Sequence, residues 1–201
     1  GWTFPEMDVG IIPVREEPLV AWEETSLLPT GEVGEICVAG PVVTESYHQR
    51  PEANSRAKIP EESQARTWHR MGDLGYRDSK GRLWFCGRKA ERVVLEDGTC
   101  LYTDCCEAVF NQHAQVFRTA LVGVEGKGTT EPVLVVEPEA GVFPRSASDR
   151  ERLIQELKAL GEKTAGTRRI QRFVFRRDFP VDVRHNAKIH RLSLKRWLEK
   201  A

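Results

Sequence analysis

A lysine near the end of the chain is the first residue whose surroundings point to chemistry. Lys188 lies in the segment FPVDVRHNAKIHR, residues 179–191, a proline-led loop between an apolar run and a short terminal helix pattern. Residues 168–196 carry 10 basic residues against Asp178 and Asp182, although the 201-residue chain has 30 residues of each sign and no net charge. A basic end of this kind could face the phosphate of a nucleotide or of a nucleic acid, or could be a solvated surface.

An aspartate in the first half offers a second chemical group. Asp73 lies between Gly72 and Gly75 in the segment WHRMGDLGY, where a tight backbone lets a carboxylate project past the end of a strand. Its two acceptor oxygens could take the paired hydroxyls of a ribose. The alternative is an aspartate that only caps its own turn.

Several other kinds of site find no support in the sequence. Gly31, Gly34 and Gly40 do not form a GxxxxGK[ST] or GxGxxG phosphate loop, so they indicate turns. The five cysteines are odd in number, contain no CxxC pair and have no histidine at zinc-finger spacing, which favours reduced thiols and no metal. No apolar run is long enough for a membrane span, and the N-terminus lacks a leader pattern, so we expect a cytosolic protein. A start at Gly1 within a strand-rich passage suggests a piece of something longer.

The first half predicts a small, distorted antiparallel sheet or barrel. Two apolar runs interrupted by prolines lie within 8–22, and residues 35–38 form a clearer strand. Short strands at 75–77 and 82–86 flank the turn at 78–81. Residues 47–58 predict a loop with one helical turn.

From residue 89 onward the pattern is β, β, α, β, β, α, β, loop, α, which predicts a compact α+β domain. Asp104 with Glu107, and Ser148 with Glu151, predict capping boxes at the starts of two helices, and Gly166 predicts the end of the second. Cys105 and Cys106 lie in the first of these helices, so helix packing is a simpler role for them than a redox pair. The last helix presents an apolar face of Leu194, Trp197 and Leu198, which could close the domain's own core or dock a partner.

Taken together, four ordered motifs resemble the adenylate-forming superfamily of acyl-CoA synthetases, luciferases and peptide-synthetase adenylation domains. The motifs are GEVGEICVAGPVVTESYHQRPE, HRMGDLGY, GRKAERV with Gly98, and the closing FPVDVRHNAKIHR. The resemblance covers roughly residues 29–191. It implies a β-rich C-terminal subdomain of the AMP-binding domain at 1–87 and a mobile α+β lid domain at 88–201.

The resemblance also implies roles for single residues. Asp73 and Arg88 would bind the ribose of ATP, and Lys188 would bridge the carboxylate substrate and the α-phosphate. The hinge would lie at Ala90, where the family has Asp or Lys, with Lys89 able to serve beside it. Asn186-Ala187-Lys188 stands where the family has Asn-Gly-Lys. The family's phosphate loop, adenine motif and substrate pocket are missing, so ATP and Mg²⁺ would be held mainly by a part before Gly1, and the chain alone would not catalyse adenylation.

One subgroup fits these motifs better than the others, namely the β-lactone synthetases of long-chain olefin biosynthesis. It is indicated by HNAKI after PVDVR and by the shortened segment ERVVLEDGTCLYTDCCEAVF. This resemblance implies ATP-dependent activation of a long-chain 2-alkyl-3-hydroxy fatty acid and its closure to a lactone. It also suggests an assembly with other olefin-pathway enzymes as a partner. The alternatives are a fatty-acyl-CoA ligase and a nucleic-acid-binding module that uses the arginines of 168–177, although that strand lacks an aromatic platform for bases.

Overall fold

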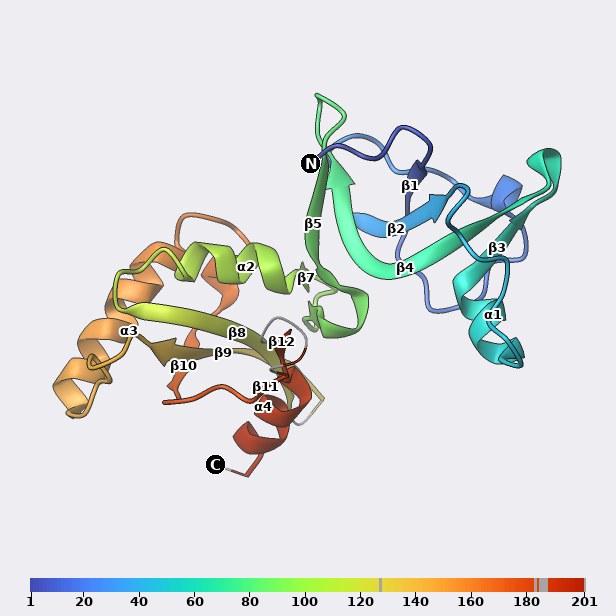
Figure 1. The fold of residues 1–201 in the computed structure, drawn as a ribbon. Helices are drawn as coiled ribbons and strands as arrows, with labels where there is room; N and C mark the ends of the chain where they lie inside the picture. Colours follow the sequence, from blue (N-terminus) through green and yellow to red (C-terminus); the bar gives the residue numbers. More distant parts are fainter. Residues whose placement is uncertain (127, 183, 185–187, 201) are drawn as a thin grey trace. The chain divides into compact units, whose positions relative to one another are not determined.

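The chain folds as two compact units, residues Gly1–Ala90 and Glu91–Ala201. A computed structural model describes residues 1–126, 128–182, 184 and 188–200. Figure 1 shows a sheet-rich first unit and a second unit in which helices and a sheet are layered. The predicted α+β class is therefore confirmed. The division falls between residues 90 and 91, against 87 and 88 in the sequence-based prediction.

The first unit is built on an antiparallel sheet. Its strands lie in the order β1-β2-β4-β3, and β5 pairs with β4. The long strand β4 contacts β2, β3 and β5, and Figure 1 shows it curving through the unit. Short helical segments connect the strands. The bounds are β1 (Asp8–Ile12), η1 (Trp22–Glu24), β2 (Gly34–Ala39), α1 (Pro51–Ala57), β3 (Lys58–Glu61), η2 (Glu62–Gln64), β4 (Arg66–Arg77) and β5 (Leu83–Arg88).

Two local predictions for this unit were wrong. The second apolar run of 8–22 is not a strand, because Trp22 turns inward in η1 and stacks on Trp68 with ring centroids 3.7 Å apart. Residues after Pro51 form a full helix, α1, rather than a single turn. In the first place the packing of Trp22 on Trp68 outweighs the strand-like apolar composition, and in the second the proline at the helix start outweighs the polar, loop-like composition.

The second unit contains a three-stranded sheet in the order β10-β9-β8, with β10 parallel and β8 antiparallel to β9. Small hairpins precede and follow this sheet: β6 pairs with β7, and β11 pairs with β12. The bounds are η3 (Lys89–Glu91), which crosses the division between units, then β6 (Val93–Val94), β7 (Cys100–Leu101), α2 (Thr103–Phe110), β8 (Val116–Glu125), β9 (Thr130–Pro138), α3 (Ala147–Gly161), η4 (Thr167–Arg169), β10 (Arg172–Phe175), β11 (Val181–Asp182), β12 (Lys188–Ile189) and α4 (Arg191–Leu198).

Both faces of this sheet are buried. Alternate residues of β9 point to opposite sides: Leu134 and Val136 pack with α2 and α3, whereas Val133 and Val135 pack with α4. Burial on both faces explains why the strand reads as a continuous apolar run. Figure 1 shows α4 and the β11–β12 hairpin on the side of the sheet away from α2 and α3.

The helix of residues 191–198 closes the core of its own unit. Leu194 and Leu198 are buried in the cluster that contains Val133 and Val135, and Trp197 packs against the same cluster. The Arg176 guanidinium lies 4.8 Å from the centroid of the Trp197 ring. The predicted apolar face is therefore used inside the unit.

The helix starts were located only approximately. Helix α2 begins at Thr103 after Tyr102, without a side-chain cap, so the Asp104–Glu107 capping box was wrong. Helix α3 is capped by Ser146, whose Oγ accepts from the Asp149 N–H at 3.0 Å, two residues before the predicted box. That helix ends at Gly161, and the predicted stop Gly166 instead directly precedes η4 as its N-cap residue.

No disulfide joins the five cysteines, all of which lie within the described residues. Cys106 is buried in helix α2 and its neighbour Cys105 is exposed, as helix packing predicts. Burial raises the pKa of Cys106 to about 12. Within the described part of the chain, none of the helices has the length and apolar character to cross a bilayer.

Candidate functional site

Asp73 and Arg88 lie directly opposite each other on neighbouring strands. The register of β4 and β5 pairs the two residues, and Nη1 of Arg88 lies 2.5 Å from Oδ1 of Asp73. The Asp73 side chain is 15% exposed and that of Arg88 is 47% exposed. The structure thus brings together two of the residues that the sequence predicted for one ribose site.

The backbone at Asp73 differs from the prediction in one respect. Asp73 lies inside the twelve-residue strand β4 rather than beyond a strand end. Gly72 has a positive φ of 67°, and the ladder to β5 is irregular between Leu74 and Gly75. A Cβ on Gly75 would lie 2.4 Å from the Trp84 carbonyl oxygen, so only glycine allows this close approach of β5. The glycines therefore shape the strand pair that carries the two charged residues.

The turn that joins β4 to β5 is organised by a different aspartate. Asp78 accepts hydrogen bonds from the Lys80 N–H at 3.0 Å, the Arg82 N–H at 2.9 Å and the Trp84 indole N–H at 2.9 Å. The Trp84 bond and the other donors hold the pKa of the Asp78 carboxyl below its usual range. Capping of a turn is thus the role of Asp78, and Asp73 is the ion-paired residue of the strand.

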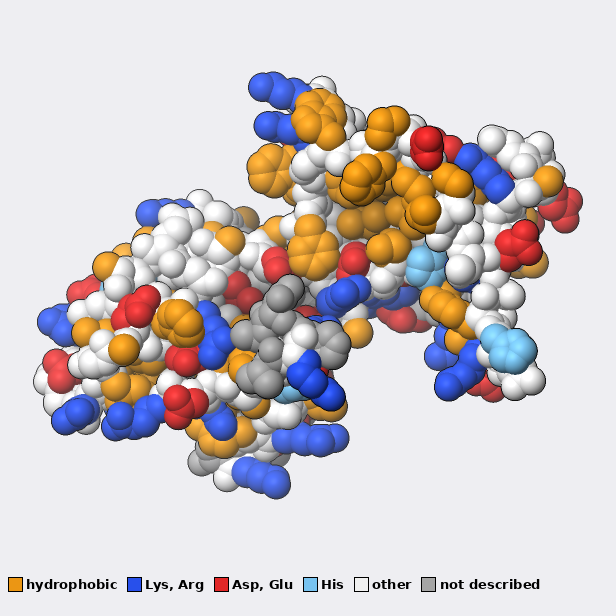
Figure 2. Space-filling model, viewed as in Figure 1, with side chains coloured by type: hydrophobic (Ala, Val, Ile, Leu, Met, Phe, Trp, Pro, Cys, Tyr) orange, Lys and Arg blue, Asp and Glu red, His pale blue; other side chains and the backbone are white. Residues whose placement is uncertain are grey.

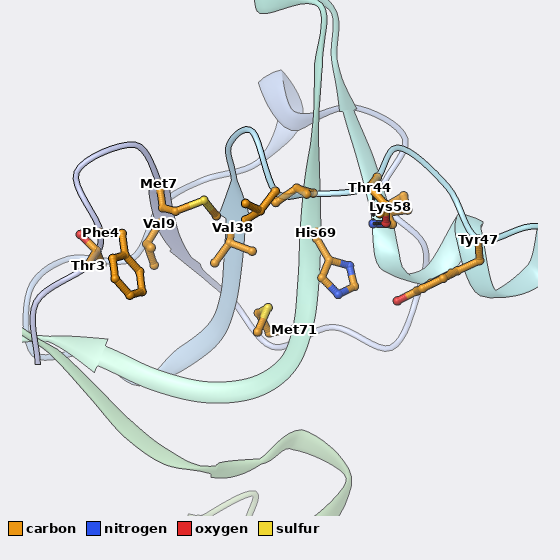
Figure 3. A pocket seen from close by; sticks show the side chains of 12 residues that line it. Thr3, Phe4, Met7, Val9, Val38, Thr44, Tyr47, Lys58, His69 and Met71 are labelled. Carbon is orange, nitrogen blue, oxygen red and sulfur yellow. Dashed lines mark hydrogen bonds between the residues drawn. The ribbon is translucent and has the colours of Figure 1, made fainter.

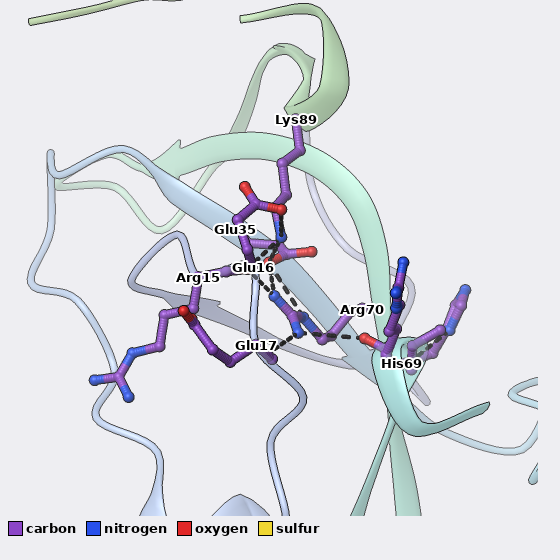
Figure 4. Close-up of polar contacts among 9 residues, drawn as sticks. Arg15, Glu16, Glu17, Glu35, His69, Arg70 and Lys89 are labelled. Carbon is purple, nitrogen blue, oxygen red and sulfur yellow. Dashed lines mark hydrogen bonds and ion pairs between the residues drawn. The ribbon is translucent and has the colours of Figure 1, made fainter. Parts of the chain in front are cut away.

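Lys89 is anchored in a buried ionic cluster of the first unit, shown in Figure 4. Its Nζ lies 3.2 Å from Glu35 Oε2 and also donates to the Arg15 carbonyl. The same Glu35 oxygen accepts from Arg70 Nη2 at 2.6 Å. Glu35 and Arg70 are 2% and 5% exposed, and Arg70 also donates to the Glu17 carbonyl at 2.9 Å. The residue directly before the predicted pivot Ala90 is therefore held by the core of its own unit.

Sequence reasoning did not single out Glu35 or Arg70. Each is a charged residue inside a strand that also carries buried apolar side chains: Glu35 is followed by Ile36 and Cys37 in β2, and Arg70 lies two positions after Trp68 in β4. Buried charges are rare unless they are paired, so this placement was the one available signal. The partner could not be read from the sequence, because the two residues are separated by 35 positions.

Lys188 lies in the second unit, at the first position of strand β12, and is exposed. Its backbone pairs with Asp182 across the β11–β12 hairpin. The ammonium is therefore carried on a short two-stranded hairpin and is accessible to solvent. The predicted replacement of the family's glycine involves Asn186 and Ala187, which lie outside the described residues.

The basic end of the chain is largely paired with carboxylates of its own unit. Arg168 lies 2.8 Å from Glu162, Arg169 lies 2.8 Å from Asp97, and Arg172 lies 2.8 Å from Glu131. These intramolecular pairs reduce the positive field that a nucleic acid would meet. These three arginines, two in η4 and one at the start of β10, thus have a structural use without a nucleic acid.

An apolar pocket of about 420 Å³ lies on the first unit, over β1 and β2, where Figure 2 shows hydrophobic side chains gathered. Figure 3 shows Phe4, Met7, Val38 and Met71 along its apolar part. At its polar end Lys58 Nζ already donates to Thr44 Oγ1 at 3.1 Å and to the Thr44 carbonyl. The polar groups of the pocket are thus used internally rather than arranged around a reacting atom.

His69 lines the same pocket and gives a prediction of pH dependence. Burial, with a further contribution from the nearby Lys58 ammonium, lowers the pKa of His69 below its ordinary value, while its Nδ1 contacts the Ala57 carbonyl at 3.1 Å. The unfolded chain then binds the proton more readily than the folded chain. The stabilisation is present above about pH 6.5, the ordinary histidine pKa, and is lost as the pH falls through the lower folded value.

We expect His69→Gln to flatten the decrease of unfolding free energy between about pH 7 and pH 5. Tryptophan fluorescence during urea unfolding would measure it, since four of the five tryptophans precede residue 90. His48, an exposed histidine of the same unit, is the control, and His48→Gln should leave the slope unchanged. Equal slopes for the wild type and His69→Gln would contradict this interpretation.

Proteins named olefin β-lactone synthetase are similar to nearly the whole chain. The protein of Stenotrophomonas maltophilia is 47% identical over 193 residues, which make up 94% of this chain and 34% of the relative. The protein of Xanthomonas campestris pv. campestris is 46% identical over 193 residues, with the same coverage of both chains. The chain belongs to the adenylate-forming enzymes. It spans about a third of the length of these curated relatives and corresponds to their C-terminal part.

Solved structures agree with this assignment to the adenylate-forming enzymes. The amide bond synthetase McbA from Marinactinospora thermotolerans is 25% identical, with a TM-score of 0.73 over 96% of this chain and 35% of that chain. A benzoate CoA ligase from Burkholderia xenovorans LB400 is 27% identical, with a TM-score of 0.72 over 95% of this chain and 34% of that chain. ATP-bound MatB from Rhodopseudomonas palustris shares the fold, with a TM-score of 0.75 at 20% identity over 99% of this chain and 35% of that chain. No family model matches the chain. The family predicted from the four motifs is confirmed.

Proposed function

We propose that the full-length protein containing this chain is an ATP-dependent, AMP-forming ligase. It would activate a long-chain 2-alkyl-3-hydroxy fatty acid and close it to a β-lactone in olefin biosynthesis. The observation that carries this proposal is 47% identity, over 94% of the chain, with a protein named olefin β-lactone synthetase. The solved structure of ATP-bound MatB, which shares the fold, supports ATP as the nucleotide.

In this proposal Asp73 and Arg88 bind the ribose of ATP. Asp73 has two acceptor oxygens on a mostly buried side chain, and the half-exposed Arg88 guanidinium lies beside it. A carboxylate can accept from both ribose hydroxyls, and these charge-assisted bonds are stronger than bonds between neutral groups. The ion pair itself fixes the orientation of the Asp73 carboxylate before the nucleotide binds.

Lys188 acts on the reacting groups. A substrate carboxylate oxygen attacks the α-phosphorus of ATP, the bond to the β-phosphate oxygen breaks, and pyrophosphate leaves. Two negative groups must approach each other, and further charge develops on the phosphoryl oxygens. A positioned ammonium lowers the free energy of that transition state, and removal of one such donor typically costs two to three orders of magnitude in rate, about 3 to 4 kcal/mol.

In the second step the 3-hydroxyl oxygen of the same molecule attacks the acyl carbonyl carbon. The bond between that carbon and the AMP oxygen breaks, AMP leaves, and the hydroxyl proton passes to a base or to solvent. Ring strain opposes the four-membered lactone, whereas the mixed anhydride supplies a good leaving group. We assign no residue of this chain to that proton transfer.

We propose that the second unit moves about Ala90, the last residue of the first unit. Motion of a separate unit that carries Lys188 would couple substrate binding to chemistry and product release. Mg²⁺ would accompany the ATP phosphates and be held mainly outside this chain. Among the described residues no group of three or more His, Cys, Asp and Glu side chains is arranged to hold a metal ion. We place the enzyme in the cytosol, within an assembly of olefin-pathway enzymes.

The products of the full-length protein test the proposed function. We expect AMP, pyrophosphate and a β-lactone from ATP and a 2-alkyl-3-hydroxy fatty acid, at a rate that does not depend on coenzyme A. Proton NMR of the extracted lipid identifies the lactone. Formation of a thioester that requires coenzyme A, with no lactone, would replace this function by that of an acyl-CoA ligase.

A further inference from the structure

A mostly buried arginine lies three positions after Lys188 and binds two carboxylates. Nη1 of Arg191 donates to Glu107 Oε1 at 2.6 Å, and Nη2 donates to Glu107 Oε2 at 3.0 Å. Nε of the same guanidinium donates to Glu91 Oε2 at 2.9 Å. We call Arg191, Glu107 and Glu91 the arginine clamp. Its geometry is the two-pronged fork that arginine forms with carboxylates and that lysine cannot reproduce.

The clamp connects elements that are far apart in the sequence. Arg191 is the first residue of α4, Glu107 lies in α2, and Glu91 ends η3. Glu107 Oε1 also accepts the backbone N–H of Leu121 in β8 at 2.7 Å. One buried guanidinium thus ties the start of α4 to the helix and strand that form the centre of the second unit.

Removing these charged groups from water costs desolvation free energy. The Arg191 and Glu107 side chains are 14% and 9% exposed, and burial raises the pKa of Glu107 to about 7 against the pull of Arg191. A buried ion pair is often no more stabilising than well-packed apolar residues of the same volume, although loss of one partner is costly. A contribution to the free energy of unfolding therefore explains the clamp poorly. A role in orienting the segment that carries Lys188 explains it better.

Among the residues that the structure describes, few other contacts hold the strand that carries Lys188. Strand β12 is two residues long and pairs with the two residues of β11. After Lys188, Ile189 packs against the cluster around Leu194, and the His190 N–H donates to the Pro180 carbonyl at 2.8 Å. The clamp follows immediately, so it fixes the end of the segment from which the lysine projects.

Glu91 gives the clamp a second connection, to the predicted pivot. It is the first residue of the second unit and directly follows Ala90, while Lys89 before it is bound to Glu35 in the first unit. The residues on either side of Ala90 are therefore each held by ion pairs within their own unit. Rotation would then be confined to the backbone around Ala90, and the clamp would transmit it to the Lys188 segment as a rigid body.

We propose that the arginine clamp positions Lys188 for adenylation and couples its strand to the pivot at Ala90. This inference rests on the proposed role of Lys188. Arg191, Glu107 and Glu91 are positioning residues that act through the lysine, since their polar groups are engaged with one another.

A double-mutant cycle in the full-length protein tests the clamp. Arg191→Lys keeps the charge and removes the fork, so we expect kcat for adenylation to fall by about 10- to 100-fold, as expected for a displacement of a reacting group by about 1 Å. The KM for ATP should change by less than about twofold, since the ribose residues lie in the other unit. In a Lys188→Ala background the same substitution should cause almost no further loss, because its effect passes through the lysine.

The control is Arg172→Lys, which alters a single ion pair to Glu131 at 2.8 Å on the surface of the same unit and should leave kcat unchanged. Glu107→Gln, which keeps the shape of Glu107 and removes its charge, gives an independent route if Arg191→Lys does not fold. An equal loss of kcat in both backgrounds, or no loss in either, would overturn the positioning role. Near-normal turnover by Lys188→Ala alone would instead refute the role of Lys188 itself, and the two failures are therefore distinguishable.

Discussion

Replacement of Lys188 by alanine in the full-length enzyme is expected to lower the rate of acyl-adenylate formation by about 100- to 1,000-fold. The side chain is exposed at the start of β12, so its removal leaves no cavity and no unpaired buried carboxylate. Melting temperature and ATP affinity should therefore stay close to those of the wild type. ATP–pyrophosphate exchange measures the rate, and equilibrium dialysis measures ATP binding.

Lys195→Ala is the matched control for this experiment. Lys195 is a lysine of the same unit, lies on helix α4 and pairs with Glu125 at 3.2 Å. A surface pair of this kind contributes little, so the variant should retain wild-type exchange activity. Equal rates for the Lys188→Ala and Lys195→Ala variants would contradict the role of Lys188.

Replacement of Asp73 by alanine should have a different signature, in which ATP binding weakens. A hydrogen bond to a charged group contributes roughly 1.5 to 3 kcal/mol, so the loss of the ribose contacts predicts an increase in Kd for ATP of about 10- to 100-fold. Because the nucleotide is bound similarly before and during reaction, saturating ATP should recover much of kcat.

The ribose hydroxyls give this prediction a specific control. The wild type should bind 2′,3′-dideoxy-ATP less tightly than ATP, and Asp73→Ala should bind the two nucleotides with nearly equal affinity. Asp8→Ala removes a carboxylate that also lies 2.5 Å from an arginine, Arg66, and it should leave ATP binding unchanged. Undiminished discrimination against the dideoxy nucleotide by Asp73→Ala would exclude the ribose contact.

The order of elements in the second unit could be predicted because each strand and helix has its own local pattern. The two runs around 119–124 and 132–137 are buried on both faces and therefore read as continuous apolar strands. The caps were less predictable, since Ser146 and Ser148 offer similar patterns two residues apart and only Ser146 accepts the Asp149 N–H. Glu107 matched a capping pattern but is bound to Arg191, which lies 84 positions away.

The residues of the candidate site were likewise predictable only in part. Asp73 and Arg88 were predicted from motifs, and a hairpin brings them together because Asp78 organises the turn between them. The ion-paired clusters around Glu35 and Arg191 were missed, since their partners are distant in sequence and no spacing rule connects them. Local periodicity can reveal which face of an element is buried, but it does not reveal which charge meets which in the interior.

The transfer of one oxygen atom tests the proposed adenylation most directly. If the substrate carboxylate attacks the α-phosphorus, a 2-alkyl-3-hydroxy fatty acid labelled with oxygen-18 in its carboxylate must pass one labelled oxygen to the phosphate of AMP. Mass spectrometry of the AMP released by the full-length enzyme during lactone formation should therefore show one oxygen-18 per molecule. AMP without the label, or ADP as the nucleotide product, would contradict adenylation of the carboxylate.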